Sequence, residues 1–302
     1  MSNDKTVHNN RPGEREKEEK KRAYEAQVQA YVEEELKKRE RNRKRIIRLC
    51  SILGTICLLY VGLYMYEDYK TRINYEQMAN IKEEADKFPT YEKEEQTPKI
   101  NYTNDEIKIP EVLEEYKKLY NMNKKLIGWL KIVDTNIDYP VMQTADNSYY
   151  LDHNINQEKD RNGALFLDKD CNVINRSTNL IIYGHHMKSG RMFGNLDKYE
   201  SESYYKKHPE IYFDTIYEKG TYEIMYVFRS RVYSESEVVF KYYQFIDCYS
   251  EQEFDSNMQE MSKLSLYDTG VTAEFGDELL TLSTCDSTVD DGRFVVVAKK
   301  ID

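Results

Sequence analysis

Apolar and polar positions follow three different patterns along this chain of 302 residues. Residues 1–45 are mostly charged and polar, whereas residues 49–66, LCSILGTICLLYVGLYMY, contain no charged side chain at all. A helix rises 1.5 Å per residue, so this run comes close to spanning a hydrocarbon core of ~30 Å. The pattern predicts a charged tail over residues 1–45, a transmembrane helix over 46–66 and a polar stalk over 67–102.

The charges that flank the apolar run predict its orientation. Residues 37–48 carry eight basic side chains and one acidic side chain, while EDYKTR after the run is mixed. Basic segments are retained in the cytoplasm, so the N-terminus is expected inside and the C-terminal domain outside the cell. A cleaved signal peptide fits less well, because a long polar region precedes the run and no small residues follow it. We therefore expect a single-pass membrane protein.

Residues 103–302 have the pattern of one mainly β domain. Apolar residues recur at helical spacing within residues 110–130, and again within residues 250–264. Between and after these stretches lie eight short apolar runs bounded by Asn, Asp, Gly and Pro: WLKIV, NIDYPVM, ALFL, NLIIYG, EIYF, TYEIMYVF, ELLTLSTC and RFVVVAK. Eight short strands with few helices predict a closed or nearly closed β-barrel. An N-terminal helical segment precedes it, and one helix is inserted between late strands.

Charge and cysteine content narrow the function. Residues 1–45 hold 14 Lys/Arg and 10 Asp/Glu, a balance of +4, so the formal net charge of −10 leaves −14 for residues 46–302. Such an acidic domain argues against nucleic acid as a partner. Cys50 and Cys57 fall in the apolar run, which leaves Cys171, Cys248 and Cys285 in the C-terminal domain. Three is an odd number, so at least one thiol is unpaired or pairs with another chain, even if Cys171 and Cys248 form a disulfide.

Three strand ends carry side chains suited to thiol chemistry. Cys285 ends an apolar run, where a cysteine is most often a small buried apolar residue, but His185 and Arg293 also stand at strand ends. A thiol needs a histidine as proton partner, and a tetrahedral oxyanion needs a donor such as a guanidinium. His185 and His186 point to opposite faces of an extended chain and cannot easily share a metal ion. Metal-binding motifs are lacking, so neither a metal nor a cofactor is expected.

Several sequence blocks resemble the class B sortases, membrane-anchored cysteine transpeptidases of Gram-positive cell walls. They are TLSTCDSTVDDGRFVVVAKK, IIYGHHMKSGRMFGNLDKY, LIGWLKIVDTNIDYPVMQTADNSYYLDHN and NGALFLD, and the resemblance runs from about residue 110 to the C-terminus. It implies a sortase-type barrel with Cys285 as nucleophile, His185 as general acid and base, and Arg293 as donor to the oxyanion or substrate carbonyl. It further implies substrate contacts by Asn147, Leu151, Ser283 and Asp286.

The resemblance also implies a reaction and its partners. The enzyme would cleave a C-terminal sorting signal of a secreted protein, of Leu-Pro-x-Thr-Gly or Asn-Pro-x-Thr-Asn/Gly type, after the threonine. A thioacyl-cysteine intermediate would then transfer the protein to an amine of a cell-wall precursor or peptidoglycan. Alternatives are a pilin-polymerising sortase, a cysteine peptidase that uses only water, and a non-enzymatic surface scaffold. The scaffold leaves the Gly-His, Cys and Arg blocks without a purpose.

Overall fold

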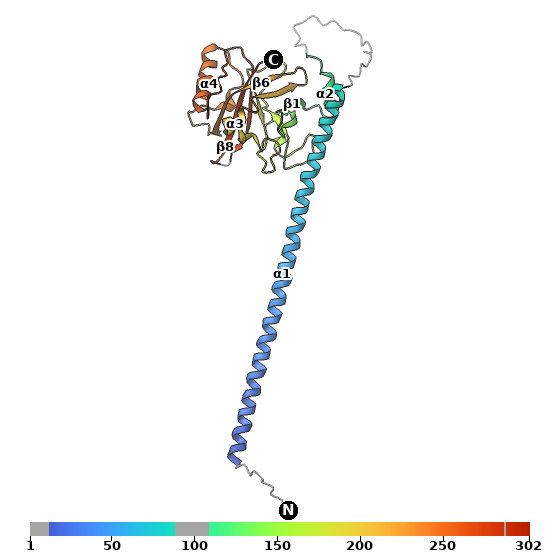
Figure 1. Ribbon diagram of the computed structural model, residues 1–302, viewed down its shortest axis with the longest axis vertical. Coiled ribbons are helices and arrows are strands. Elements are labelled where there is room, and N and C mark those ends of the chain that lie inside the picture. The colour runs from blue at the N-terminus through green and yellow to red at the C-terminus, as the bar shows by residue number, and fades with distance from the viewer. Residues whose placement is uncertain (1–11, 88–108, 287) are drawn as a thin grey trace, which may run out of the picture. The chain divides into compact units, whose positions relative to one another are not determined.

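The computed structural model describes residues 12–87, 109–286 and 288–302. The chain forms two compact units, Met1–Tyr69 and Lys70–Asp302, and helix α1 (Pro12–Lys87) runs through the boundary between them (Figure 1). In the first unit the described residues are helical. They include one segment long and apolar enough to cross a membrane, with a mean hydropathy of 2.1. This helix fits the predicted transmembrane segment.

The last part of α1 is packed into the second unit. Thr71, Tyr75 and Met78 are only 3%, 7% and 5% exposed, and Tyr75 and Met78 belong to the main apolar core. Residues 70–87 of the predicted stalk therefore belong to the second unit, because the Tyr75 ring and the Met78 thioether are buried in its core. Residues 88–102 of that predicted stalk, and residues 1–11 of the predicted tail, lie outside the described residues.

Eight strands close into a barrel in the order β1-β2-β3-β4-β7-β8-β6-β5, which confirms the predicted fold class. Strand β3 pairs in parallel with β2 and β7 in parallel with β4, and the other neighbouring pairs are antiparallel. The strands are β1 (Leu126–Lys131), β2 (Asp138–Met142), β3 (Leu165–Leu167), β4 (Asn179–Tyr183), β5 (Glu210–Thr215), β6 (Thr221–Arg231), β7 (Leu279–Asp286) and β8 (Gly292–Lys300).

Each of the eight predicted runs contains or overlaps one of these strands, but the helix before them is shorter than its periodicity predicted. Helix α2 covers only Glu114–Met122. Leu126, which continues the helical spacing in the sequence, is instead the first residue of β1 and pairs with Met142 on β2. The chain leaves the helix at Asn123, whose backbone is extended and whose side-chain oxygen accepts a hydrogen bond from the Lys125 backbone N–H over 2.9 Å.

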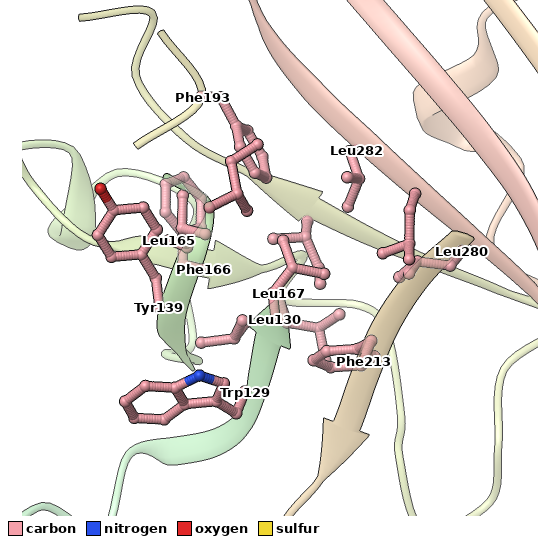
Figure 2. Packing of buried hydrophobic residues seen from close by; sticks show 14 of the residues in the cluster. Trp129, Leu130, Tyr139, Leu165, Phe166, Leu167, Phe193, Phe213, Leu280 and Leu282 are labelled. Carbon is pink, nitrogen blue, oxygen red and sulfur yellow. The ribbon is translucent and has the colours of Figure 1, made fainter. Parts of the chain in front are cut away.

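Two apolar cores hold the barrel. Figure 2 shows the larger one, in which side chains from β1, β3, β5 and β7 meet; they include Trp129, Leu130, Leu165, Leu167, Phe213, Leu280 and Leu282. The smaller core lies between the sheet and helix α4 (Glu251–Leu264). It is formed by residues that include Met225, Phe228, Phe254, Met258, Met261, Val295 and Val297. Strands β7 and β8 are therefore buried along most of their length, and side chains are freed only near their ends.

The helix predicted between late strands is α4, which follows β6 and precedes β7. Ser250 caps its N-terminus by accepting a hydrogen bond from the Glu253 backbone N–H over 3.2 Å. Phe254, Met258 and Met261 recur at helical spacing on its buried face. The short helix α3 (Glu202–Tyr205) and the 3-10 turns η1 (Tyr149–Leu151), η2 (Leu196–Glu200) and η3 (Tyr242–Gln244) complete the described elements.

Candidate active site

Cys285 and Arg293 are directly opposite each other on neighbouring antiparallel strands. In the ladder between β7 and β8, Cys285 pairs with Arg293, and Asp286 pairs with Gly292. Residues that lie opposite in such a ladder present their side chains to the same face of the sheet. Residues Leu279 to Thr284 of β7 are buried, whereas the Cys285 side chain is exposed. The strand pairing therefore places an accessible thiol beside a guanidinium.

The Arg293 guanidinium is held by the backbone carbonyls of the two preceding residues. Its Nη1 donates to the carbonyl oxygen of Gly292 at 2.8 Å and to that of Asp291 at 3.3 Å. An alternative interpretation of the sequence pairs this arginine with the carboxylate of Asp290 or Asp291, but both hydrogen bonds go to carbonyl oxygens. Asp291 has a positive φ of 55° in the turn between the strands. These bonds leave the remaining N–H groups of the guanidinium for another acceptor.

His185 leaves the barrel beside Cys285. Strand β4 runs parallel to β7, with Tyr183 paired to Ser283, so His185 and Cys285 each follow the last matched pair by two residues. Gly184 connects strand β4 to His185. A Cβ atom there would lie 2.3 Å from Leu165 Cδ2 and 2.8 Å from Phe193 Cδ2. A larger residue before the histidine would therefore require the Leu165 and Phe193 side chains to shift.

One nitrogen of the His185 ring is committed to the backbone. Nε2 lies 2.7 Å from the carbonyl oxygen of Leu151. A carbonyl oxygen only accepts, so Nε2 carries the hydrogen, and Nδ1 is the nitrogen left to take up or release a proton. The backbone of His185 is held as well, since its carbonyl accepts a hydrogen bond from the Phe193 N–H at 3.0 Å.

The second histidine has different partners. His186 Nε2 lies 3.2 Å from Asp197 Oδ2, and its backbone forms an isolated antiparallel bridge with Met192. The rings of His185 and His186 therefore have different partners. Within the described parts of the chain, no three His, Cys, Asp or Glu side chains gather as potential ligands of a metal ion.

Ser283 and Asp286, both predicted to contact substrate, flank Cys285 but have internal partners. Ser283 is 1% exposed, and its Oγ lies 2.7 Å from the hydroxyl of Tyr242 in η3. Asp286 accepts a hydrogen bond from Arg229 Nε at 2.8 Å, and the same guanidinium donates to both carboxylate oxygens of Glu200. A role of Ser283 in substrate recognition would therefore act through Tyr242. A role of Asp286 would act through its ion pair with Arg229, which Glu200 shares.

The structure brings Leu151 to His185, and the Asn147 side chain is hydrogen-bonded within a loop. Leu151 contributes its carbonyl to His185, while its side chain is 41% exposed. Both polar ends of the Asn147 side chain are used in the loop after β3: Nδ2 donates to Asp168 Oδ2 at 2.8 Å, and Oδ1 accepts from the Lys169 N–H at 2.8 Å. These bonds brace the loop, so a substrate contact by Asn147 stays a prediction.

Three contacts at the site were not expected from the sequence. Thr284 Oγ1 donates to the Gly184 carbonyl at 2.8 Å, Tyr242 meets Ser283, and Arg229 holds Asp286. Strand alternation could have indicated Thr284, because a polar residue next to an outward-facing Cys285 must face inward. Tyr242 and Arg229 are distant in sequence, and no local pattern marks them.

The other cysteines are not equivalent to Cys285. All five thiols are free, so Cys171 and Cys248 do not form a disulfide. Cys171 is buried in the larger core and Cys248 in the smaller one. Burial raises the pKa of the Cys171 thiol to about 12, and it also raises the pKa of Cys248. Neither thiol is suited to act as a nucleophile near neutral pH.

A separate cleft of about 700 Å³ is lined by none of Cys285, His185 and Arg293. Lys125, Gln143, Tyr149, Cys171 and Tyr217 are among the residues that line it. The Cys171 thiol contacts the carbonyl of Asn179, the first residue of β4, whereas His185 follows the last residue of that strand. The Cys171 side of the cleft therefore lies near the first residue of β4, and Tyr149 of η1 also lines the cleft.

Comparison with known proteins decides the family. A family model described as "Sortase domain" matches residues 130–301. This chain is 32% identical to sortase B of Listeria monocytogenes over 84% of this chain and 99% of the relative, and 28% identical to sortase B of Staphylococcus aureus over 85% and 98%. The chain belongs to the sortase B family.

Solved structures agree with this assignment. A sortase B from B. anthracis in complex with AAEK1 is 33% identical, with a TM-score of 0.63 over 79% of this chain and 99% of that one. A substrate complex of Staphylococcus aureus sortase B is 27% identical, with a TM-score of 0.64 over 78% and 99%. The protein is thus a sortase transpeptidase of the cysteine type, and the closed barrel is the sortase B barrel.

Proposed function

We propose that Cys285, His185 and Arg293 are the catalytic residues of this transpeptidase. The observation that carries the proposal is the exposed thiol of Cys285 directly opposite Arg293, with His185 leaving the adjacent strand at the same end. In a family whose chemistry requires a cysteine, this is the accessible thiol of the catalytic unit, since Cys171 and Cys248 are buried.

The geometry supports a two-step acyl transfer. Cys285 gives its thiol proton to Nδ1 of His185, its sulfur attacks the carbonyl carbon of the substrate threonine, and the remaining N–H groups of Arg293 donate to the oxyanion. The C–N bond breaks, and His185 protonates the leaving amine through Nδ1. An acceptor amine then loses a proton to His185 and attacks the thioester carbon, so that the C–S bond breaks and a new amide forms.

The substrate is a secreted protein with a C-terminal sorting signal, of Leu-Pro-x-Thr-Gly or Asn-Pro-x-Thr-Asn/Gly type. The acceptor is an amine of a cell-wall precursor or of peptidoglycan. Support for an amine acceptor comes from a structural neighbour, a sortase B with 27% identity and a TM-score of 0.63 that is described as complexed with triglycine. A pilin lysine is the alternative acceptor.

Orientation in the membrane is part of the proposal. Sortases act at the cell surface, and the one candidate span among the described residues lies in α1, after the basic segment of residues 37–48. The positive-inside rule then leaves the N-terminus in the cytoplasm and the barrel outside.

The experiment that tests this function uses the full chain in detergent with a panel of signal peptides and amines, and product masses as readout. Transpeptidation gives peptide–amine adducts whose yield rises with amine concentration. A cysteine peptidase gives the hydrolysed peptide whatever amine is added. A Cys285→Ala variant is the control, because it keeps the barrel and removes the sulfur.

A further inference from the structure

Helix α1 contacts the segment that orients the catalytic histidine. Thr71 Oγ1 donates to Asp160 Oδ2 at 2.7 Å, and Asn162 Nδ2 donates to Thr71 Oγ1 at 3.2 Å. One turn further along the helix, the Tyr75 hydroxyl donates to the carbonyl oxygen of Gly163 at 3.1 Å. Thr71 and Tyr75 are 3% and 7% exposed, so these hydrogen bonds are sheltered from water.

Gly163 lies directly against the carbonyl that His185 uses. A Cβ atom on Gly163 would be 2.3 Å from the Tyr150 carbonyl oxygen and 2.9 Å from the Leu151 carbonyl oxygen. Gly163 also has a positive φ of 60°, a conformation that glycine adopts without strain. Any displacement of Gly163 therefore changes the surroundings of the Leu151 carbonyl.

Backbone hydrogen bonds tie the same two segments together. The Ala164 N–H donates to the Tyr150 carbonyl at 2.9 Å, and the Asp160 N–H donates to the Asp152 carbonyl at 2.9 Å. Residues 150–152 are consequently braced by residues 160–164, which are themselves held by Thr71 and Tyr75. The chain of contacts runs from α1 to Gly163, then to Leu151, and ends at the imidazole.

We propose that Thr71 and Tyr75 are positioning residues for His185. They fix Asp160 and Gly163, which fix the Leu151 carbonyl, and this carbonyl keeps the hydrogen on Nε2 and leaves Nδ1 for proton transfer. The proposal rests on the role of His185 in the proposed function. The helix that includes the candidate membrane span would thus complete the acid–base machinery, in addition to anchoring the enzyme.

The test compares variants of the full chain in detergent. Tyr75→Phe keeps the ring, which packs edge-on against Tyr139 with centroids 5.2 Å apart, and removes the hydroxyl. Thr71→Val removes the hydroxyl that bonds Asp160 and Asn162, and Thr71→Ser restores a hydroxyl at this position. Lys82→Met is the matched control, because Lys82 lies further along α1 and pairs with Asp214 on β5 at 3.5 Å.

Two readouts separate positioning from stability. We expect Tyr75→Phe and Thr71→Val to lower kcat by about 2- to 10-fold, as for loss of one hydrogen bond, with little change in KM. The limb of the pH profile that belongs to His185 should move, and so should its ring ¹⁵N signals. Thr71→Ser and Lys82→Met should resemble the wild type in kcat and in both His185 readouts.

The proposal is overturned if Tyr75→Phe and Thr71→Val lower only the Tm and leave kcat and the His185 signals unchanged. It is equally overturned if Lys82→Met produces the same loss and the same signal changes, because any loosening of α1 would then suffice. The ¹⁵N signals need no turnover. A wild-type chain that cleaves no signal peptide would therefore contradict the proposed function while leaving the test of positioning intact.

Discussion

The hydroxyl of Thr284 donates a hydrogen bond of 2.8 Å to the carbonyl oxygen of Gly184. Thr284 precedes Cys285 and Gly184 precedes His185, so this bond joins the two strands directly before the thiol and the imidazole. Thr284 is 2% exposed. Parallel pairing of β4 with β7 and this cross-strand bond together determine how the Cys285 and His185 side chains are placed.

Removing that bond should impair catalysis without changing the reactive groups. Thr284→Val has nearly the same volume but leaves the Gly184 carbonyl buried without its donor, which costs about 1–3 kcal/mol of stability. We expect kcat for peptide cleavage to fall about tenfold, because a small displacement of a catalytic group has large kinetic effects. Thr284→Ser is the control and should retain most activity. Equal activity of Thr284→Val and wild type would show that the bond does not position the pair.

The two histidines should differ in importance. His185→Ala removes the proposed acid–base group, and we expect cleavage to fall by about 10²–10⁴. His186→Ala removes only a contact of 3.2 Å with Asp197 and should retain measurable turnover. Steady-state rates of both purified variants provide the comparison. The reverse ranking would assign the proton transfer to His186.

The pH dependence of stability should report on Asp286. Burial alone would raise its pKa, but hydrogen bonds from Thr288 and Arg229 outweigh burial and lower it. A carboxylate with a lowered pKa stabilises the fold above its unfolded pKa of about 3.9, and this stabilisation is lost as pH falls through the folded value.

Asp286→Asn should therefore lower the Tm at neutral pH, and the difference from wild type should shrink below about pH 4. Thermal unfolding of both proteins between pH 3 and 7 measures it. Asp290→Asn, an exposed change in the same turn, is the control and should change the Tm little at any pH. A difference that is constant across this range would contradict the assignment to the Asp286 carboxylate.

Membrane orientation gives a prediction independent of catalysis. Protease added to intact protoplasts should digest the Lys70–Asp302 unit and spare the tail before residue 46, detected by antibodies to each part. The physical reason is the basic segment of residues 37–48, which is retained on the cytoplasmic side. Protection of the barrel unit, with digestion of the tail, would reverse the proposed orientation.

The barrel could be predicted because its strands are short apolar runs separated by turn residues, and periodicity reports on such runs. Leu126 shows where this signal fails, since its spacing from α2 is helical although its hydrogen bonds are those of β1. Residues 67–102 were interpreted from their polarity alone. Burial of Thr71 and Tyr75 depends on partners about 90 positions away, which local composition cannot reveal.

The candidate site also contains residues that the sequence could indicate and contacts that it could not. Cys285, His185 and Arg293 could be proposed because each stands at the end of an apolar run and belongs to a block that resembles the family. Ser283 was predicted to contact substrate, yet whether its side chain faces the substrate or the Tyr242 hydroxyl depends on tertiary packing. The Leu151 carbonyl that holds His185 is a backbone group, so no residue type in the sequence marks it.

Arg293 provides the most direct test of the catalytic geometry. If its guanidinium stabilises the oxyanion formed at Cys285, Arg293→Ala should lower kcat by about 10²–10³. Arg293→Lys should also be severely impaired, because lysine lacks the planar fork of donors. Arg231→Ala is the matched control on neighbouring β6, where Arg231 pairs with Glu237 at the surface and should contribute little.

The decisive measurement is peptide cleavage by the Arg293 variants alongside the rate at which a small reagent alkylates Cys285. We predict a large loss of cleavage in Arg293→Ala and Arg293→Lys while alkylation proceeds at nearly the wild-type rate, since the thiol stays exposed on β7. Cleavage by Arg293→Ala at a rate close to that of wild type and Arg231→Ala would contradict the account, and Arg293 would then be a surface residue.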